Sequence, residues 1–179
     1  MEDLKSLIRE IPDFPKPGIL FYDLTTLFEN PWGLKRTLNL LEERYRSSAV
    51  DKVAGIESRG FILGAALADR LNCGFVAIRK KGKLPWKTIS QTYELEYGTD
   101  DLEIHVDAVR EREKILIVDD LLATGGTLQA SVRLVERLKG KIVGVACVAE
   151  LLGLNGRQKI EGYPLYSLLT YEGESFENL

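Results

Sequence analysis

Apolar and polar positions along the chain recur in two patterns, one typical of helices and one typical of buried strands. Apolar residues three or four positions apart predict helices over residues 4–10, 31–46, 59–71 and 127–139. Short apolar runs predict strands over residues 52–56, 74–78, 114–118, 141–149 and 164–169. Strands that alternate with helices indicate an α/β fold, in which a mostly parallel, twisted sheet is flanked by helices.

Two segments interrupt this pattern. The stretch PDFPKPG at 12–18 carries three prolines and a glycine, so we expect an irregular connector there. Residues 79–106 are polar, charged and aromatic, and a connection this long inside one domain is usually functional, often as a lid. A β-hairpin with arms over 92–97 and 102–106 fits the second segment.

Composition narrows the class of protein. The chain has 179 residues, enough for one well-buried domain, and its net charge of −3 argues against general binding to nucleic acid or membrane surfaces. Cys73 and Cys147 form no CxxC pair and lie in apolar surroundings, so we expect reduced thiols. The charged N-terminus lacks an apolar signal core, and no segment approaches the roughly 20 apolar residues of a membrane span. We therefore expect a cytoplasmic protein.

The run ILIVDDLLATGGT at 115–127 carries the most chemistry. An apolar strand ends in two acids, a glycine-rich loop follows, and a helix begins directly after it. Glycines let a backbone approach a phosphate closely, and unpaired N–H groups at a helix N-terminus bind anions. Carboxylates can accept hydrogen bonds from vicinal ribose hydroxyls or hold a hydrated Mg²⁺. The residues nominated are Asp119, Asp120, Ala123, Thr124, Gly125, Gly126 and Thr127.

This run has two alternative interpretations. The acids and glycines could merely form a capped, tight turn, although the whole arrangement before a helix makes that the weaker alternative. An ATP-binding P-loop needs a lysine directly after its last glycine, and Thr127 stands there instead.

The run resembles the phosphoribosyl pyrophosphate (PRPP) binding signature of the type I phosphoribosyltransferases. Nearly the whole chain is similar to the members of that family that act on adenine. The likeness rests on DFPKPGILF at 13–21, ESRGF at 57–61, RKKGKLP at 79–85, YELEYG at 93–98 and GRQKI at 156–160. It implies one domain over 1–179, with an N-terminal hood over 1–30 that helps to bind the base and a flexible catalytic loop over 79–106.

The resemblance also implies a reaction. Members of this kind transfer the 5-phosphoribosyl group from PRPP to N9 of adenine, releasing pyrophosphate and forming AMP, with Mg²⁺ and as homodimers. Residues 123–127 would hold the 5′-phosphate, while Asp119 and Asp120 would face the ribose hydroxyls. The metal would be held by PRPP and water, with Asp119 or Asp120 as further ligands. No nucleic-acid or membrane partner is implied.

Further roles follow from the resemblance in the same way. The pyrophosphate group would be bound by Ser58, Arg59, Arg79, Lys80 and Lys83, with a non-proline cis peptide near residue 58. Adenine would be read by the backbone near Leu20 and sandwiched by Phe21 and Leu151, although ordinary core packing is the simpler interpretation of such residues. Glu96 and Tyr97 would be catalytic, unless the acids of this loop are only solvated charges.

Some features depart from the family pattern or match no motif. Tyr22 stands where many relatives carry arginine, and Trp86 is bulkier than expected. His105 is the only histidine and we expect it to be structural or exposed. Two alternatives stay open: an enzyme that acts on 6-oxopurines (xanthine, guanine or hypoxanthine), or a regulator that binds PRPP without catalysis.

Overall fold

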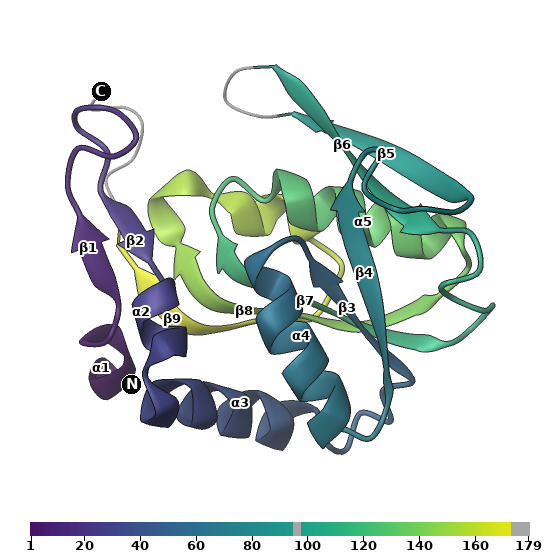
Figure 1. Ribbon diagram of the computed structural model, residues 1–179, viewed down its shortest axis with the longest axis horizontal. Coiled ribbons are helices and arrows are strands. Elements are labelled where there is room, and N and C mark those ends of the chain that lie inside the picture. The colour runs from purple at the N-terminus through teal and green to yellow at the C-terminus, as the bar shows by residue number, and fades with distance from the viewer. Residues whose placement is uncertain (95–97, 173–179) are drawn as a thin grey trace.

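The computed structural model describes residues 1–94 and 98–172. Its centre is a seven-stranded sheet with the strand order β5-β6-β4-β3-β7-β8-β9 (Figure 1). The strands are β3 (Lys52–Ile56), β4 (Gly74–Lys80), β5 (Thr88–Glu94), β6 (Thr99–His105), β7 (Lys114–Leu122), β8 (Lys141–Leu151) and β9 (Leu165–Tyr171). Strands β3, β4, β7, β8 and β9 pair in parallel, which confirms the predicted mostly parallel sheet.

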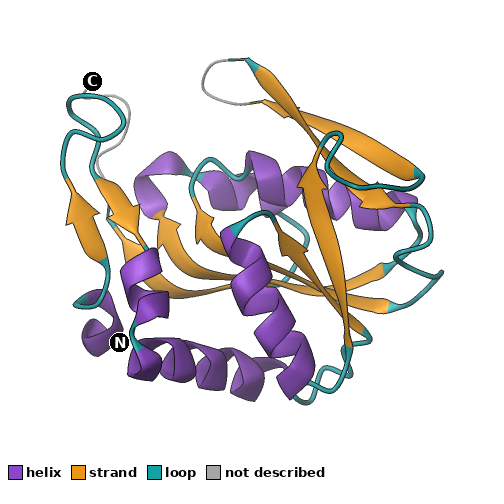
Figure 2. Cartoon of the chain, viewed as in Figure 1, coloured by secondary structure: helices purple, strands orange, loops and turns teal. Residues whose placement is uncertain are grey.

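Helices cover both faces of the sheet (Figure 2). Helices α3 (Pro31–Tyr45) and α4 (Arg59–Arg70) contribute to one apolar core, and α5 (Gly126–Arg137) contributes to a second core on the opposite face. Alternate residues of β7 serve the two cores, with Leu116 and Val118 in the first and Ile115 and Ile117 in the second. This alternation explains why a central parallel strand is apolar at consecutive positions.

The start of α3 shows how local sequence sets an element boundary. The Asn30 side chain accepts hydrogen bonds from the backbone N–H groups of Trp32 and Gly33, each 3.0 Å long, and Pro31 occupies the first helical turn. An asparagine cap followed by proline is a favoured helix start, because the capped N–H groups have no partner within the helix. The helix predicted from residue 31 is therefore confirmed.

The hood (residues 1–30) differs from its predicted form. The helix expected over 4–10 ends early as α1 (Glu2–Lys5), and β1 (Arg9–Ile11) pairs antiparallel with β2 (Phe21–Asp23). Helix α2 (Thr25–Glu29) follows. The apolar spacing in this short segment is satisfied by packing against the sheet, where Leu4 is fully buried, so its periodicity did not indicate a continuous helix.

The segment 79–106 contains the predicted hairpin, with longer arms than expected. Strands β5 and β6 pair from Thr88 opposite His105 to Glu94 opposite Thr99, and β6 also pairs with the end of β4. Tyr93, Leu102 and Ile104 are buried in the same core as α5. The hairpin therefore extends the main sheet beside the α5 face (Figure 1).

The strands at the centre continue beyond their predicted ends. Strand β7 runs to Leu122 and β8 to Leu151, because their pairing persists through Asp119 opposite Cys147 and Leu122 opposite Glu150. Asp119 and Asp120 consequently lie within β7, near its end, and not in the loop after it. The short 3₁₀ helices η1 (Leu152–Leu154) and η2 (Gly156–Ile160), which follow β8, were not predicted.

Tyr22 attaches the hood to the main sheet. Its side chain is 9% exposed, and its ring centroid lies 4.1 Å from that of Tyr171 at the end of β9. The ammonium group of Lys5 lies 5.2 Å from the centroid of the Tyr171 ring. Burial raises the pKa of the Tyr22 hydroxyl, in keeping with an apolar setting. The residue that departs from the family pattern is thus a packing residue of the hood.

We expect Tyr22→Ala to lower the free energy of unfolding by about 3 kcal/mol, because it removes a buried ring from the contact with Tyr171. Tyr22→Phe keeps the ring and should change stability by less than about 0.5 kcal/mol. Urea denaturation followed by circular dichroism measures both. Equal losses in the two variants would show that the hydroxyl, and not the ring contact, carries the attachment.

Candidate active site

The acidic pair lies at the carboxyl end of the sheet, where parallel α/β sheets bind ligands. Asp119 and Asp120 are 8% and 5% exposed at the end of β7. Gly125 follows with φ of 78° and caps α5, whose first residue is Gly126. The left-handed backbone at Gly125 is one that residues with a side chain rarely adopt. The strand, loop and helix order predicted from the sequence is confirmed.

Electrostatics sets the two acids apart. The Nε of Arg59 donates a hydrogen bond to Asp120 Oδ2, and the backbone N–H of Asp120 donates to Asp119 Oδ1 over 2.9 Å. Burial, followed by the neighbouring charge of Asp120, raises the pKa of Asp119 well above its ordinary value of 3.8. Asp119 therefore keeps a proton more readily than a solvated acid, whereas Asp120 has a cationic partner.

The loop 57–60 packs directly against this strand end. The peptide bond between Glu57 and Ser58 is cis, which confirms the expected non-proline cis peptide. A Cβ at Gly60 would lie 2.9 Å from the carbonyl oxygen of Val118 and 3.1 Å from Asp119 Oδ1. A glycine is therefore required at this close approach. Arg59, predicted to bind pyrophosphate, donates a hydrogen bond to Asp120.

The predicted basic residues converge on the same loop through Glu57. Arg79 Nε and the backbone N–H of Lys80 donate to Glu57 Oε2 over 3.1 and 2.8 Å. Arg79 Nη1 also donates to the carbonyl oxygen of Lys83 over 3.1 Å, and Lys80 Nζ lies 3.0 Å from Asp100. The structure thus brings Arg79 and Lys80 into contact with Glu57, the residue before Ser58, and acids balance the charges of Arg79 and Lys80.

The hairpin reaches the start of α5. A Cβ at Gly126 would lie 3.0 Å from the carbonyl oxygen of Glu94. A cavity of ≈420 Å³ lies between them, lined by Thr92, Tyr93, Glu94, Thr99, Gly126, Gln129 and Lys159. Glu96 and Tyr97 lie outside the described residues, but the flanking strands end at the loop predicted to bind phosphate.

The residues expected at the base are exposed or half-buried. Leu20 is 42% exposed, so it is not a core residue. Phe21 begins β2 and meets Phe14 edge-to-face with ring centroids 5.1 Å apart. Leu151 ends β8 opposite Tyr171, whose ring contacts Tyr22. Sequence reasoning missed Phe14, which lies in the irregular connector and has no periodic pattern to reveal it.

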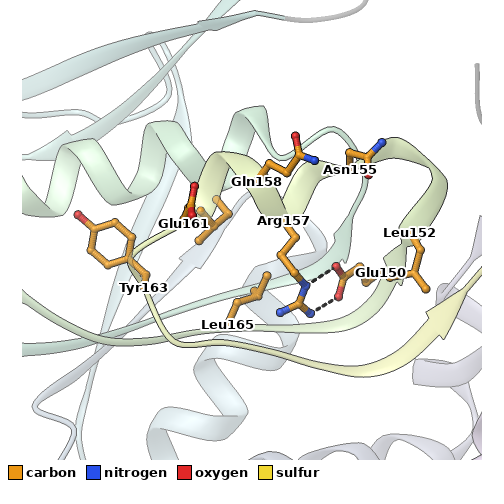
Figure 3. Close-up of a pocket in the computed structure, with 9 residues that line it drawn as sticks. Glu150, Leu152, Asn155, Arg157, Gln158, Glu161, Tyr163 and Leu165 are labelled. Atoms are coloured by element: carbon orange, nitrogen blue, oxygen red, sulfur yellow. Dashed lines mark hydrogen bonds and ion pairs between the residues drawn. The ribbon is translucent and has the colours of Figure 1, made fainter.

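Glu150 and Arg157 were also missed. Glu150 is 2% exposed at the end of β8, and the guanidinium of Arg157 pairs with its carboxylate (Figure 3). Both residues line a pocket of ≈660 Å³ together with η2 and the start of β9. An acid inside the apolar run VACVAELL was the available signal, since a charge in a buried strand is normally paired.

Over 1–94 and 98–172, no group of three or more His, Cys, Asp and Glu side chains is arranged to hold a metal ion. Asp119 and Asp120 are the predicted acids that could still contact a metal brought by a substrate. Across the same ranges, none of the helices combines the length and apolar character needed to span a membrane.

The model of the family described as phosphoribosyl transferase domain matches residues 23–169. This stretch includes loop 57–60, the hairpin, the acidic pair and the loop before α5. The chain belongs to the phosphoribosyltransferase family, which confirms the predicted resemblance.

Individual relatives define the group within the family. Adenine phosphoribosyltransferase of Koribacter versatilis is 54% identical over 171 residues, 96% of this chain and 94% of the relative. The crystal structure of adenine phosphoribosyltransferase from Thermoanaerobacter pseudethanolicus superposes with a TM-score of 0.92 at 49% identity, covering 95% of this chain and 99% of that one. The Saccharomyces cerevisiae enzyme, complexed with an imino-altritol bisphosphate and adenine, has a TM-score of 0.87 at 41% identity and covers 94% and 97%. Within the family, the chain belongs with the adenine phosphoribosyltransferases.

The charge difference between the two aspartates predicts opposite effects on stability. Asp119→Asn should leave the free energy of unfolding at pH 7 unchanged or raise it, because the amide replaces a buried acid and keeps an oxygen for the N–H of residue 120. Asp120→Asn should lower the free energy of unfolding by about 1–2 kcal/mol, because Arg59 loses its charged partner but is partly exposed to water.

The pH dependence has a definite sign. The pKa of Asp119 is raised in the folded state, so its contribution to stability is greatest below 3.8 and falls as pH rises toward the folded pKa. Asp119→Asn should remove this fall in unfolding experiments run from acid to neutral pH. A variant that is less stable than Asp120→Asn, or that keeps the fall, would contradict the assignment of the proton.

Proposed function

We propose that the chain transfers the 5-phosphoribosyl group of PRPP to N9 of adenine, with release of pyrophosphate and formation of AMP, as in purine salvage. The observation that carries the proposal is the buried acidic pair at the end of β7, followed directly by the glycine loop and the N-terminus of α5. Its nearly full-length similarity to adenine phosphoribosyltransferases supports the choice of adenine over 6-oxopurines.

The donor would lie across the end of β7. Ala123, Thr124, Gly125, Gly126 and Thr127 would bind the 5′-phosphate through backbone N–H groups and hydroxyls, aided by the positive end of the α5 dipole. Asp119 and Asp120 would accept hydrogen bonds from the ribose hydroxyls. A proton on Asp119 would leave one oxygen free to accept and make the other a donor.

The pyrophosphate would lie over loop 57–60. Ser58, Arg59, Arg79, Lys80 and Lys83 would surround it, and arginine forks suit paired phosphate oxygens. Arg59 would exchange its contact with Asp120 for a shared contact with the donor. Mg²⁺, when bound with PRPP, would neutralise the leaving group, and the oxygen-only donor set of Asp119 and Asp120 fits its preferences.

In the reaction, the bond between C1′ and the pyrophosphate oxygen breaks, the bond between C1′ and N9 forms, and the N9 proton leaves. As positive charge develops on the sugar, water could attack C1′ in place of adenine, so the site must exclude water. The hairpin, whose arms end beside Gly126, would cover the site. Glu96 would accept the proton, and Tyr97 would lie with it at the reacting centre.

Adenine would bind between the hood and the end of β8. Phe21 and Leu151 would sandwich the ring, and the backbone near Leu20 would pair with the exocyclic amine. The yeast relative, whose structure was determined with adenine bound, supports a base site of this kind. A site that hydrogen-bonds an amine discriminates strongly against a purine with an oxo group in its place, because the buried partner would be left unpaired.

We also propose that the protein is a cytoplasmic homodimer. Ile62 on α4 and Phe75 on β4 are 48% and 39% exposed, and the ring of Phe61 meets that of Phe75 edge-to-face with centroids 5.7 Å apart. Aromatic side chains are enriched at subunit interfaces, and the exposed Phe75 and Ile62 suit such a surface. The free thiols of Cys73 and Cys147 support a reducing compartment.

A panel of purines tests the proposed reaction. With PRPP and Mg²⁺, adenine should give AMP at a kcat/KM at least about 100-fold above that for hypoxanthine, guanine or xanthine. An oxopurine would leave the backbone group that pairs with the exocyclic amine of adenine without a partner. Nucleotide formation is followed by chromatography, with Mg²⁺ omitted in a parallel reaction. Preference for an oxopurine would favour the sister enzyme, and PRPP binding without any nucleotide would favour the regulator.

A second experiment addresses the catalytic acid. Glu96→Gln should lower kcat by about 100-fold and leave PRPP binding within twofold, because general-base assistance is lost while the donor site is intact. Glu111→Gln is the control, since the Glu111 side chain is 60% exposed in a pair with Lys139 and is outside the proposed site, and its kcat should stay near that of the unaltered protein. Unchanged turnover in Glu96→Gln would remove Glu96 from the mechanism.

A further inference from the structure

We infer that Glu150 and Arg157 are positioning residues that hold the loop at 123–127 in place for the 5′-phosphate of the donor. The inference rests on the proposed function, because it assigns a support to the phosphate site proposed above. Neither residue is among the predicted site residues, although Arg157 lies in the GRQKI motif at 156–160. Glu150 lies near the end of β8 in the sheet, and Arg157 lies on η2, whose first residue contacts that loop.

The first step is the anchoring of Arg157 to the sheet. Arg157 lies on η2 and reaches back to the end of β8, where its Nε donates to Glu150 Oε1 over 2.8 Å and its Nη2 donates to Oε2 (Figure 3). The hydroxyl of Ser167 on β9 donates to the same Oε2 over 2.6 Å. The carboxylate is thereby fixed by two elements, and the planar guanidinium has one orientation.

The charges of this pair are stable in the fold. Burial alone raises the pKa of Glu150, but the hydrogen bonds from Arg157 and Ser167 outweigh it, so the pKa lies below its ordinary value. The hydrogen bond to Glu150 raises the pKa of Arg157. The Glu150 side chain is 3% exposed and that of Arg157 is 52% exposed, so the carboxylate is shielded from water, and the two-pronged contact fixes the orientation of the guanidinium against it.

The second step is the contact between the neighbour of Arg157 and the glycine loop. A Cβ on Gly156 would lie 2.1 Å from the carbonyl oxygen of Ala123 and 2.8 Å from the backbone nitrogen of Gly125. A Cβ on Gly125 would in turn lie 2.4 Å from the carbonyl oxygen of Gly156. The two backbones therefore touch, and no side chain intervenes that could absorb a displacement.

These contacts form a short rigid path. It runs from Glu150 in the sheet through Arg157 and Gly156 to Gly125, which caps the helix that would receive the phosphate. Binding groups must be held to within about 0.5 Å of their productive positions, so a support that shifts by more than this weakens the ligand contact. We expect loss of the fork to weaken binding of the phosphate group of the donor and to change adenine binding only slightly.

The test variant is Arg157→Lys, which keeps the positive charge but cannot make the two-pronged contact. We expect KM for PRPP to rise about tenfold or more, with KM for adenine within about twofold, in line with the sensitivity of sites to displacements near 1 Å. Arg133→Lys on the exposed face of α5 is the matched control, because its pair with Glu136 is solvated, and both KM values should be unchanged.

Calorimetric binding of ribose 5-phosphate separates this inference from the proposed reaction, because it needs no turnover. Weakened binding in Arg157→Lys supports the positioning role even if adenine proves not to be the acceptor. Unchanged ribose 5-phosphate affinity, or an equal rise in both KM values, would overturn it. Should Arg157→Lys fold poorly, Ser167→Ala removes a single hydrogen bond and should raise the KM for PRPP two- to threefold, and no rise would again overturn the inference.

Discussion

The burial of two neighbouring carboxylates at the end of β7 is the constraint on which the site depends. Two ionised acids this close and this buried are strongly unfavourable unless a cation or a proton compensates them. Arg59 compensates the charge of Asp120, whereas burial and the neighbouring charge raise the pKa of Asp119, which favours its protonated, neutral form. Because Arg59 begins α4, this pairing also fixes loop 57–60 against the strand, where only a glycine fits at position 60. The contacts that pack loop 57–60 against β7 therefore also set the positions of the two acids.

The same solution is repeated along the carboxyl edge of the sheet. Glu57 follows β3 and pairs with Arg79, Asp120 near the end of β7 pairs with Arg59, and Glu150 near the end of β8 pairs with Arg157. Each pair ties a loop to a strand end. Under the proposed function, the first two arginines face a polyanionic donor and can share their charge with it, whereas the third holds the phosphate loop from behind. Preorganisation of this kind reduces the ordering that a bound substrate would otherwise have to impose.

The sequence predicted the elements whose pattern is long and periodic, and it predicted the site wherever residues were contiguous. Helices α3, α4 and α5 and the parallel strands follow from apolar spacing. The contiguous residues 119–127 are enough by themselves to predict an anion site. The hood was predicted poorly, because its strands are three residues long and are held by contacts such as Tyr22 with Tyr171, which are 149 positions apart. The pairing of Glu150 with Arg157 was missed for a related reason, since it depends on the turn after β8 folding back on the strand. Contacts made across the fold or across a turn leave little trace in local periodicity.

A crystal structure with PRPP and Mg²⁺ bound tests the central claim most directly, namely that the end of β7 is a preformed ribose phosphate site. The account predicts the 5′-phosphate within hydrogen-bond distance of the backbone N–H groups at the start of α5, the ribose hydroxyls on Asp119 and Asp120, and Arg59 drawn toward the pyrophosphate. It also predicts that the glycine loop and residues 155–157 keep their ligand-free positions. A donor bound elsewhere, or a glycine loop that forms only when the phosphate arrives, would contradict it.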